Sequence, residues 1–316
     1  MRSASWIILI VAFCRVVSAD DNVLGLPAPR NAEHPGAVVL HGGGRISEDV
    51  FERFIELAGG KEARIVFVPS AGWRPSDYQS ESAFLDVIRS RFSSWVALGT
   101  NKRVKNFQFL YTDSPRAAES ATFVKPLETA TGVWFSGGDQ ARLNYRFVGN
   151  FPSQTKFQIA LRQILERGGV VGGTSAGTAA IPEVMTLWHE YEDFDAPATA
   201  VAAHGLGVLT SAIVEQHFDA RGGRLERFTG LLRDNDKLDR LTGRDGVGVT
   251  MLGLAVEERS ALIVRGDHLQ VLGGANAHVF AKSNQGKTLI WHELAPGEAA
   301  ELKRDRTGSV ELRRGK

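Results

Sequence analysis

A glycine-rich hexapeptide carries the clearest chemical signal in this chain. Residues 172–177 read Gly-Gly-Thr-Ser-Ala-Gly, directly after the apolar pair at 170–171 and before a run of small residues suited to a helix start. This is the G-x-S-x-G pattern of a nucleophile elbow, where a strand turns sharply into a helix and exposes a reactive serine. Gly173 and Gly177 fit that turn, because Cβ atoms there would collide with the strand and the helix. The pattern predicts a nucleophilic Ser175 at a sheet edge, beside helix N–H groups that can hold an oxyanion.

A nucleophilic serine needs a base, and His217 is the best placed of the eight histidines. Residues 211–218 form a strand-like apolar run that ends in polar residues, and His217 lies at its end. We therefore expect it at a strand terminus, on the same sheet edge as the elbow. The other histidines lie in the lead segment, a charged loop, turns or late strands, where a structural role is the usual one.

The elements that must position these residues follow an alternating pattern. Strand-like runs cover 37–41, 64–69, 107–111, 132–136 and the run into the elbow, and helical segments cover 48–57, 84–96 and 157–167. Such alternation predicts a parallel sheet with helices on both faces. Ligands bind beyond the carboxyl ends of strands in such sheets, and the glycine clusters at 42–44, 137–138 and 172–173 fall at those ends.

The texture of the sequence changes from about residue 263. Segments 262–267, 268–273 and 277–281 look like short strands joined by Gly-rich turns. They predict an antiparallel extension of the same domain. We therefore expect residues 20–316 to form a single α/β domain, with a mostly parallel sheet flanked by helices and a C-terminal antiparallel strand extension.

The N-terminal residues have the features of a signal peptide. Arg2 precedes a short apolar stretch at 6–14, and residues 17–19 end in Ala19 before the expected cut. The apolar stretch is shorter than the ~20 residues that a membrane-spanning helix needs. We expect residues 1–19 to be cleaved, which makes the protein secreted or periplasmic and leaves no membrane attachment. Cleavage also removes Cys14, the only cysteine, and so excludes a cysteine nucleophile.

Bulk composition excludes several other functions. The chain has 316 residues with 43% hydrophobic content and a formal net charge of +1. This balance gives no electrostatic case for a nucleic-acid partner or a membrane-surface partner. The sequence contains no H-E-x-x-H or comparable cluster, so we expect no metal site and no cofactor.

Four separated motifs together resemble a known family. They are Phe-Ser-Gly-Gly-Asp-Gln at 135–140, the elbow at 172–177, Glu-Gln-His-Phe at 215–218 with Arg221 following, and Leu-Ala-Val-Glu-Glu-Arg-Ser-Ala at 254–261. In this order they resemble the cyanophycinase branch of the dipeptidase E serine-peptidase family. The resemblance implies a class I glutamine amidotransferase-like fold, and the strand and glycine turn at 37–44 also fit it.

The resemblance implies a catalytic triad in the chain order Ser, His, acid. It carries over to Ser175 as nucleophile, His217 as general base and Glu258 as the acid that orients the imidazole. The oxyanion hole would be formed by the backbone N–H groups of Ala176 and Gly138.

Glu257 is the neighbour that could be confused with Glu258. In an alternating strand only one of the two side chains points toward His217. The pattern of the family favours Glu258.

The resemblance also implies a polar pocket for an aspartyl unit linked to arginine. The matching positions are Gln140, Glu215, Gln216, Arg221, Arg224 and Arg227. Glu215 stands where the family usually has aspartate, and the spacing between the first two arginines is one residue wider. We expect Arg221 to bind a substrate carboxylate, while Glu215 either reaches the substrate guanidinium or supports a pocket arginine. The sequence leaves that choice open.

The implied function is that of a secreted serine exopeptidase acting on cyanophycin, an aspartate-backbone polymer with arginine on each side-chain carboxyl. Its products would be β-aspartyl-arginine dipeptides, and its partner a peptide or polymer rich in aspartate and arginine. The sequence is compatible with a homodimer but does not determine the oligomeric state.

Three alternatives remain. One is an aspartyl or isoaspartyl dipeptidase of the same family. Another is a serine esterase, because His-Gly-Gly-Gly at 41–44 matches the oxyanion motif of some lipases, although those enzymes place the acid before the histidine. The third is a module of the same fold that only binds ligands.

Overall fold

The structure is a computed structural model of the chain, and it describes residues 22–187, 201–283, 285–305 and 308–315. The expected signal peptide, residues 1–19, lies outside the described residues. Over the ranges just given, no helix is both long and apolar enough to cross a membrane.

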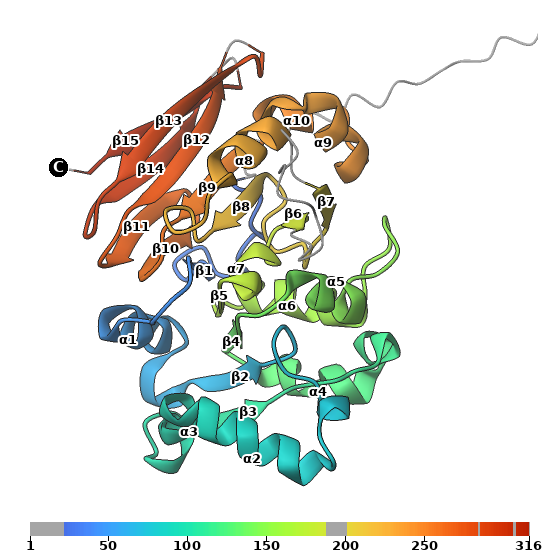
Figure 1. The fold of residues 1–316 in the computed structure, drawn as a ribbon. Coiled ribbons are helices and arrows are strands. Elements are labelled where there is room, and N and C mark those ends of the chain that lie inside the picture. Colours follow the sequence, from blue (N-terminus) through green and yellow to red (C-terminus); the bar gives the residue numbers. More distant parts are fainter. Residues whose placement is uncertain (1–21, 188–200, 284, 306–307, 316) are drawn as a thin grey trace, which may run out of the picture.

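A nine-stranded mixed sheet forms the centre of the described part of the chain (Figure 1). Its strand order is β15-β14-β11-β10-β1-β5-β4-β2-β3. The bounds are β1 (Ala37–His41), β2 (Arg64–Val68), β3 (Asn106–Phe109), β4 (Gly132–Phe135), β5 (Val170–Thr174), β10 (Ser260–Arg265), β11 (His268–Gly273), β14 (Ala299–Arg304) and β15 (Val310–Arg314). β1 to β5 pair in parallel, and the later four strands continue the sheet antiparallel beyond β1. The expected α/β class with an antiparallel C-terminal extension is therefore confirmed.

A second, four-stranded sheet follows the order β13-β12-β9-β8. Its strands are β8 (Ala212–Gln216), β9 (Leu252–Val256), β12 (Ala277–Ser283) and β13 (Thr288–Leu294), and a small ladder joins β6 (Val184–Leu187) to β7 (Val201–His204). β8 and β9 pair in parallel. The expectation that His217 shares a sheet edge with the elbow is therefore wrong, because β8 belongs to this second sheet. An apolar run predicts a buried strand, but it does not identify the strands with which it pairs.

Helices cover both faces of the parallel part of the large sheet. They are α1 (Glu48–Leu57), α2 (Glu81–Arg91), α3 (Ser93–Thr100), α4 (Ala121–Thr129), α5 (Gln140–Phe147), α6 (Lys156–Glu166) and α7 (Ala176–Ala179), with short 3-10 turns at Gly60–Glu62, Pro75–Asp77 and Pro115–Glu119. Three further helices, α8 (Arg224–Arg233), α9 (Asn235–Thr242) and α10 (Val247–Thr250), pack against strands of the smaller sheets. The single helix expected over 84–96 is in fact two, α2 and α3, because the chain leaves helical geometry at Phe92 (φ −109°, ψ 37°).

Alternation along the parallel strands divides the core into two layers. Val38 and Leu40 of β1 face a cluster that includes α4 and α6, whereas Val39 faces a cluster with α1 and α3. The second layer is rich in aromatic rings, with Phe54 and Trp134 centred 5.0 Å apart. These two layers fix the parallel strands, so their carboxyl ends form a rigid edge for the site.

Candidate active site

Ser175 lies at the sharp turn between β5 and α7. Its backbone has φ 55° and ψ −120°, a conformation that non-glycine residues rarely adopt and that is typical of functional sites. A Cβ on Gly173 would lie 2.6 Å from the carbonyl carbon of Gly177, and one on Gly177 would lie 2.5 Å from the carbonyl oxygen of Phe135. The steric reason for the elbow glycines is therefore confirmed. Gly173 itself lies within β5 rather than beyond its end.

Ser175, His217 and Glu258 form a continuous hydrogen-bonded chain. Ser175 Oγ lies 2.7 Å from His217 Nε2, and His217 Nδ1 is hydrogen-bonded to Glu258 Oε1. The carboxylate can only accept, so Nδ1 carries the proton and Nε2 is the acceptor for the serine proton. His217 is buried, and the Glu258 side chain is about one-third exposed at 32%. This is the geometry that acyl transfer requires of a nucleophile, a base and an orienting acid, the roles expected of these three residues.

The glycine loop after β1 supports the base. His217 has a left-handed backbone (φ 50°), and its N–H donates to the carbonyl of Gly42 at 2.8 Å. A Cβ on Gly43 would lie 2.2 Å from His217 Cε1, so only glycine leaves room for the imidazole. The loop that resembles a lipase oxyanion motif thus packs against the catalytic base, which weakens the esterase interpretation.

The turn between β9 and β10 selects Glu258 over Glu257. Both residues lie beyond the end of β9, so the expectation that strand alternation separates them is wrong. The backbone N–H of Glu258 donates to Asp219 Oδ1 at 2.8 Å, while Glu257 accepts from His278 Nε2 at 2.9 Å and from the N–H of Asn276 at 3.0 Å. Sequence reasoning missed Asp219, because an acid two residues after a histidine is too common to be a signal.

The electrostatic environment keeps the base neutral. Burial is the main cause that lowers the pKa of His217 from its ordinary 6.5, and the positive charges of Arg221 and Arg224 lower it further, while Glu258 opposes the shift. His41, at the end of β1, is completely buried, and burial followed by the charge of His217 lowers its pKa to about 4. Both imidazoles are therefore neutral at pH 7.

The two expected oxyanion donors come from separate loops. Ala176 is the first residue of α7, where backbone N–H groups have no acceptor within the helix. Gly138 follows β4 together with Gly137, and a Cβ on Gly137 would lie 3.3 Å from Ser175 Cβ. The structure therefore brings the glycine loop at 137–138 beside the nucleophile and the helix start.

The expected pocket residues fall into two groups, those that are buried and one, Arg221, that is exposed. Glu215 is fully buried, and its carboxylate accepts hydrogen bonds from Arg224 Nη1 and from Arg227 Nε and Nη2, the latter pair at 3.0–3.1 Å. Arg224 and Arg227 are themselves 1% and 2% exposed. The choice that the sequence left open is resolved, since Glu215 supports arginines and does not reach outward. Arg221 is the exposed member of the set.

The two glutamines are also buried. Gln140, the first residue of α5, donates from Nε2 to the carbonyl of Thr186 at 3.0 Å, which ties α5 to β6. Gln216 is 3% exposed, and its side-chain oxygen has no hydrogen-bond partner among the described residues. Gln216 directly precedes His217 in the chain. No described group of three or more His, Cys, Asp or Glu residues is placed to hold a metal ion.

Comparison with known proteins identifies the family. The model of peptidase family S51 matches residues 38–272, which include all three triad positions. This chain belongs to peptidase family S51. It is a serine-type peptidase, and the resemblance found in its four motifs is confirmed.

Named relatives and a solved structure agree with this. The chain is 25% identical over 254 residues to a cyanophycinase from Geminocystis herdmanii, covering 78% of this chain and 82% of the relative. It is 27% identical over 248 residues to a cyanophycinase from Synechococcus elongatus, covering 77% and 67%. The crystal structure of a peptidase from an acI-B1 actinobacterium superposes with a TM-score of 0.54 at 20% identity, covering 84% of this chain and 97% of that one, and shows the same fold.

Proposed function

We propose that this peptidase hydrolyses cyanophycin to β-aspartyl-arginine dipeptides, with Ser175, His217 and Glu258 as its catalytic triad. The observation that carries the proposal is the hydrogen-bonded triad beside one exposed arginine, Arg221, in a chain whose named relatives are cyanophycinases. An aspartyl or isoaspartyl dipeptidase is the second candidate, because it needs the same triad and a smaller pocket.

The geometry provides for each step of acyl transfer. Ser175 Oγ attacks the scissile carbonyl carbon while its proton passes to His217 Nε2. The N–H groups of Ala176 and Gly138 stabilise the negative oxygen of the tetrahedral intermediate. His217 then returns the proton to the leaving amine as the C–N bond breaks. In the second half of the reaction His217 Nε2 takes a proton from water, which attacks the acyl carbon. The acyl group is then released as Ser175 Oγ regains a proton from His217.

The charged residues after His217 supply the substrate contacts in this proposal. Arg221 presents a planar fork that suits a carboxylate of the substrate. Arg224 and Arg227, the buried arginines that follow Arg221 in the chain, are held by Glu215.

We also propose that the protein acts outside the cytoplasm. The support is the basic residue, short apolar stretch and small residues at 1–19. The test is N-terminal sequencing of the mature protein from the producing cells, which should begin at Asp20. A retained residue 1 would contradict export by this route.

The substrate is tested by mass spectrometry after incubation with cyanophycin. The expected product is β-aspartyl-arginine, absent with Ser175→Ala. Arg221→Ala should lower kcat/KM by a factor that corresponds to about 2–4 kcal/mol of lost transition-state stabilisation. Arg221→Lys should recover only part of the loss.

A p-nitrophenyl ester is the control substrate, since it needs the triad but not the pocket. Cleavage of small aspartyl dipeptides alone would favour the dipeptidase candidate. Good ester hydrolysis with no action on cyanophycin would contradict the proposal.

A further inference from the structure

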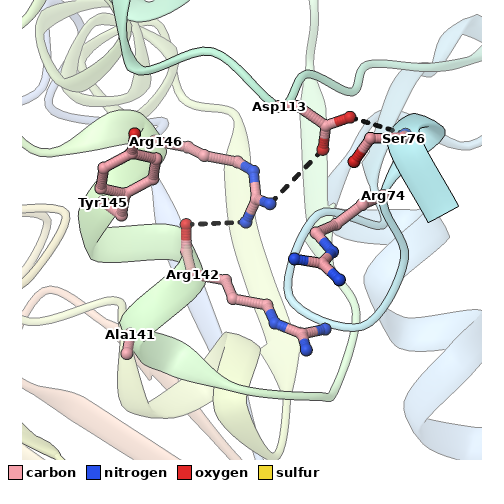
Figure 2. A pocket seen from close by; sticks show the side chains of 7 residues that line it. All are labelled: Arg74, Ser76, Asp113, Ala141, Arg142, Tyr145 and Arg146. Carbon is pink, nitrogen blue, oxygen red and sulfur yellow. Dashed lines mark hydrogen bonds and ion pairs between the residues drawn. The ribbon is translucent and has the colours of Figure 1, made fainter.

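A charged cavity is lined by residues other than those of the triad. It has a volume of about 320 Å³ and is lined mainly by polar side chains at the ends of β2 and β3 and along α5 (Figure 2). The lining includes Arg74, Ser76, Asp113, Arg142, Tyr145 and Arg146. No described member of the triad or of the pocket around Arg221 takes part in it.

The cavity holds one positive charge more than its carboxylates balance. Arg74 forms a two-pronged contact with Asp77 at 2.9 and 2.6 Å, and Arg146 pairs with Asp113 at 3.4 Å. Arg142 has no carboxylate partner among the described residues. Figure 2 shows the three guanidinium groups gathered around the same space, with Asp113 beside only one of them.

This gathering of like charges is electrostatically unfavourable. Arg146 is 5% exposed, and its Nε atom is buried without a hydrogen-bond partner among the described residues. Burial is the main cause that lowers the pKa of Arg146, and the charges of Arg142 and Arg74 lower it further against the opposing effect of Asp113. A bound anion would relieve both the repulsion and the unsatisfied donor.

The cavity is connected to the nucleophile through a short run of backbone. Arg142 Nη1 donates to the carbonyl of Gly72 at 3.4 Å. A Cβ on Gly72 would lie 2.9 Å from the carbonyl oxygen of Gly137, and a Cβ on Gly137 would lie 3.3 Å from Ser175 Cβ. The cavity and the nucleophile therefore lie on neighbouring stretches of one sheet edge, so an extended substrate can reach both.

We propose that this cavity is a second subsite, in which Arg142 binds a carboxylate of the substrate several groups away from the bond that is cleaved. A guanidinium suits this role because it binds a carboxylate through two parallel hydrogen bonds. Arg146 and Arg74, each held by its own carboxylate, supply the surrounding positive field. The inference rests on the proposed function, since it needs a substrate that carries repeated carboxylates.

The test uses synthetic aspartyl-arginine oligomers of two, four and eight units. Arg142→Gln should raise KM for the longest oligomer at least tenfold and leave the two-unit substrate within twofold of wild type. Arg313→Gln is the matched control, because it removes the same charge from β15, at the opposite end of the large sheet. It should change nothing at any length. Arg74→Gln should show a smaller length-dependent effect in the same direction.

Three results would overturn the subsite. One is an equal loss of activity at every oligomer length, which would mean that Arg142 acts through Gly72 on the loop at 137–138 beside Ser175. Another is no loss at any length. The third is binding of inorganic phosphate at the cavity with no change in the turnover of the longest oligomer, which would make this a site for free anions.

Failure of the proposed function is distinguishable from failure of the subsite. If wild type cleaves none of the oligomers, the proposed function fails, and the subsite is tested by calorimetric titration with octa-aspartate. Arg142→Gln should then bind this peptide at least tenfold more weakly than wild type and Arg313→Gln. Equal binding by all three proteins would overturn the subsite.

Discussion

The adjacent Glu257 and Glu258 offer a test of the triad in which two neighbouring carboxylates predict opposite outcomes. Glu258 is hydrogen-bonded to Nδ1 of the base, whereas Glu257 binds His278 and a backbone N–H. Glu258→Gln preserves size but removes the charge that stabilises the imidazolium. The new amide can also donate to Nδ1, which would place the imidazole proton on Nε2, where it blocks transfer from Ser175.

The magnitude follows from the role of that charge. In serine-protease triads the same acid-to-amide change lowers kcat by about 10⁴, which corresponds to about 5 kcal/mol of transition-state stabilisation. We expect a loss of this order for Glu258→Gln with little change in stability, because its side chain is part-exposed. Glu257→Gln should instead cost about 1–3 kcal/mol of folding stability through its buried partner His278, and leave the chemistry within tenfold.

The assay is the rate at which a fluorophosphonate modifies Ser175, since it reports the activated nucleophile without assuming a substrate. Urea unfolding of the same proteins supplies the stability comparison. Equal, modest losses of rate at both positions would refute the assignment of the acid. A slower modification of Ser175 in Glu257→Gln than in Glu258→Gln would show that the turn presents Glu257 to His217 instead.

The remaining predictions concern buried charge. The rate of Ser175 modification should rise with pH to a plateau, with a midpoint below the ordinary histidine value of 6.5, because burial lowers the pKa of His217 and only the neutral imidazole accepts the proton; a midpoint above 6.5 in the pH–rate profile would contradict this. The pKa of His41 in the folded protein is about 4, so the unfolded chain takes up the proton first as the pH falls. The free energy of unfolding should therefore drop by about 3 kcal/mol between pH 6.5 and pH 4, and it should not depend on His41 above pH 7. Urea unfolding across that pH range measures this change. Glu215→Gln should cost about 3–5 kcal/mol of stability, because two buried arginines lose their shared carboxylate, and a loss under about 1 kcal/mol in urea would show that other groups compensate them. Gly43→Ala should slow Ser175 modification by about 10² or more, since its Cβ would overlap the imidazole; an unchanged rate would mean that the loop moves freely.

The sequence predicted the parallel strands because each is a short, continuous apolar run bounded by glycine or polar turns. β1, β2, β4 and the helix α6 lie within a residue or two of their expected positions. The division of the strands between two sheets was beyond such reasoning, since β8 begins with an apolar run like that of β1. Pairing depends on contacts between residues distant in the chain, such as Ala212 with Leu252, and periodicity carries no information about them.

The site shows the same division. Ser175 was predictable because the elbow needs glycines at fixed offsets from the serine, a local steric requirement. Selection of Glu258 over Glu257 depends instead on a turn whose geometry is set by Asp219, 39 positions away in the chain. The arginine cavity around Arg142 gave no signal at all, because its residues come from three separate segments and match no motif.

The triad is divided between the two sheets, and this arrangement explains why the loop after β1 is so constrained. Ser175 comes from β5 of the large sheet, whereas His217 and Glu258 follow β8 and β9 of the small one. The loop at 42–44, which follows β1, joins the segments from the two sheets. The carbonyl of Gly42 accepts from the N–H of His217, and the carbonyl of Gly43 accepts from the N–H of Arg259, each at 2.8 Å. Two backbone hydrogen bonds therefore hold the segments that carry His217 and Glu258 against the loop that follows β1 of the large sheet.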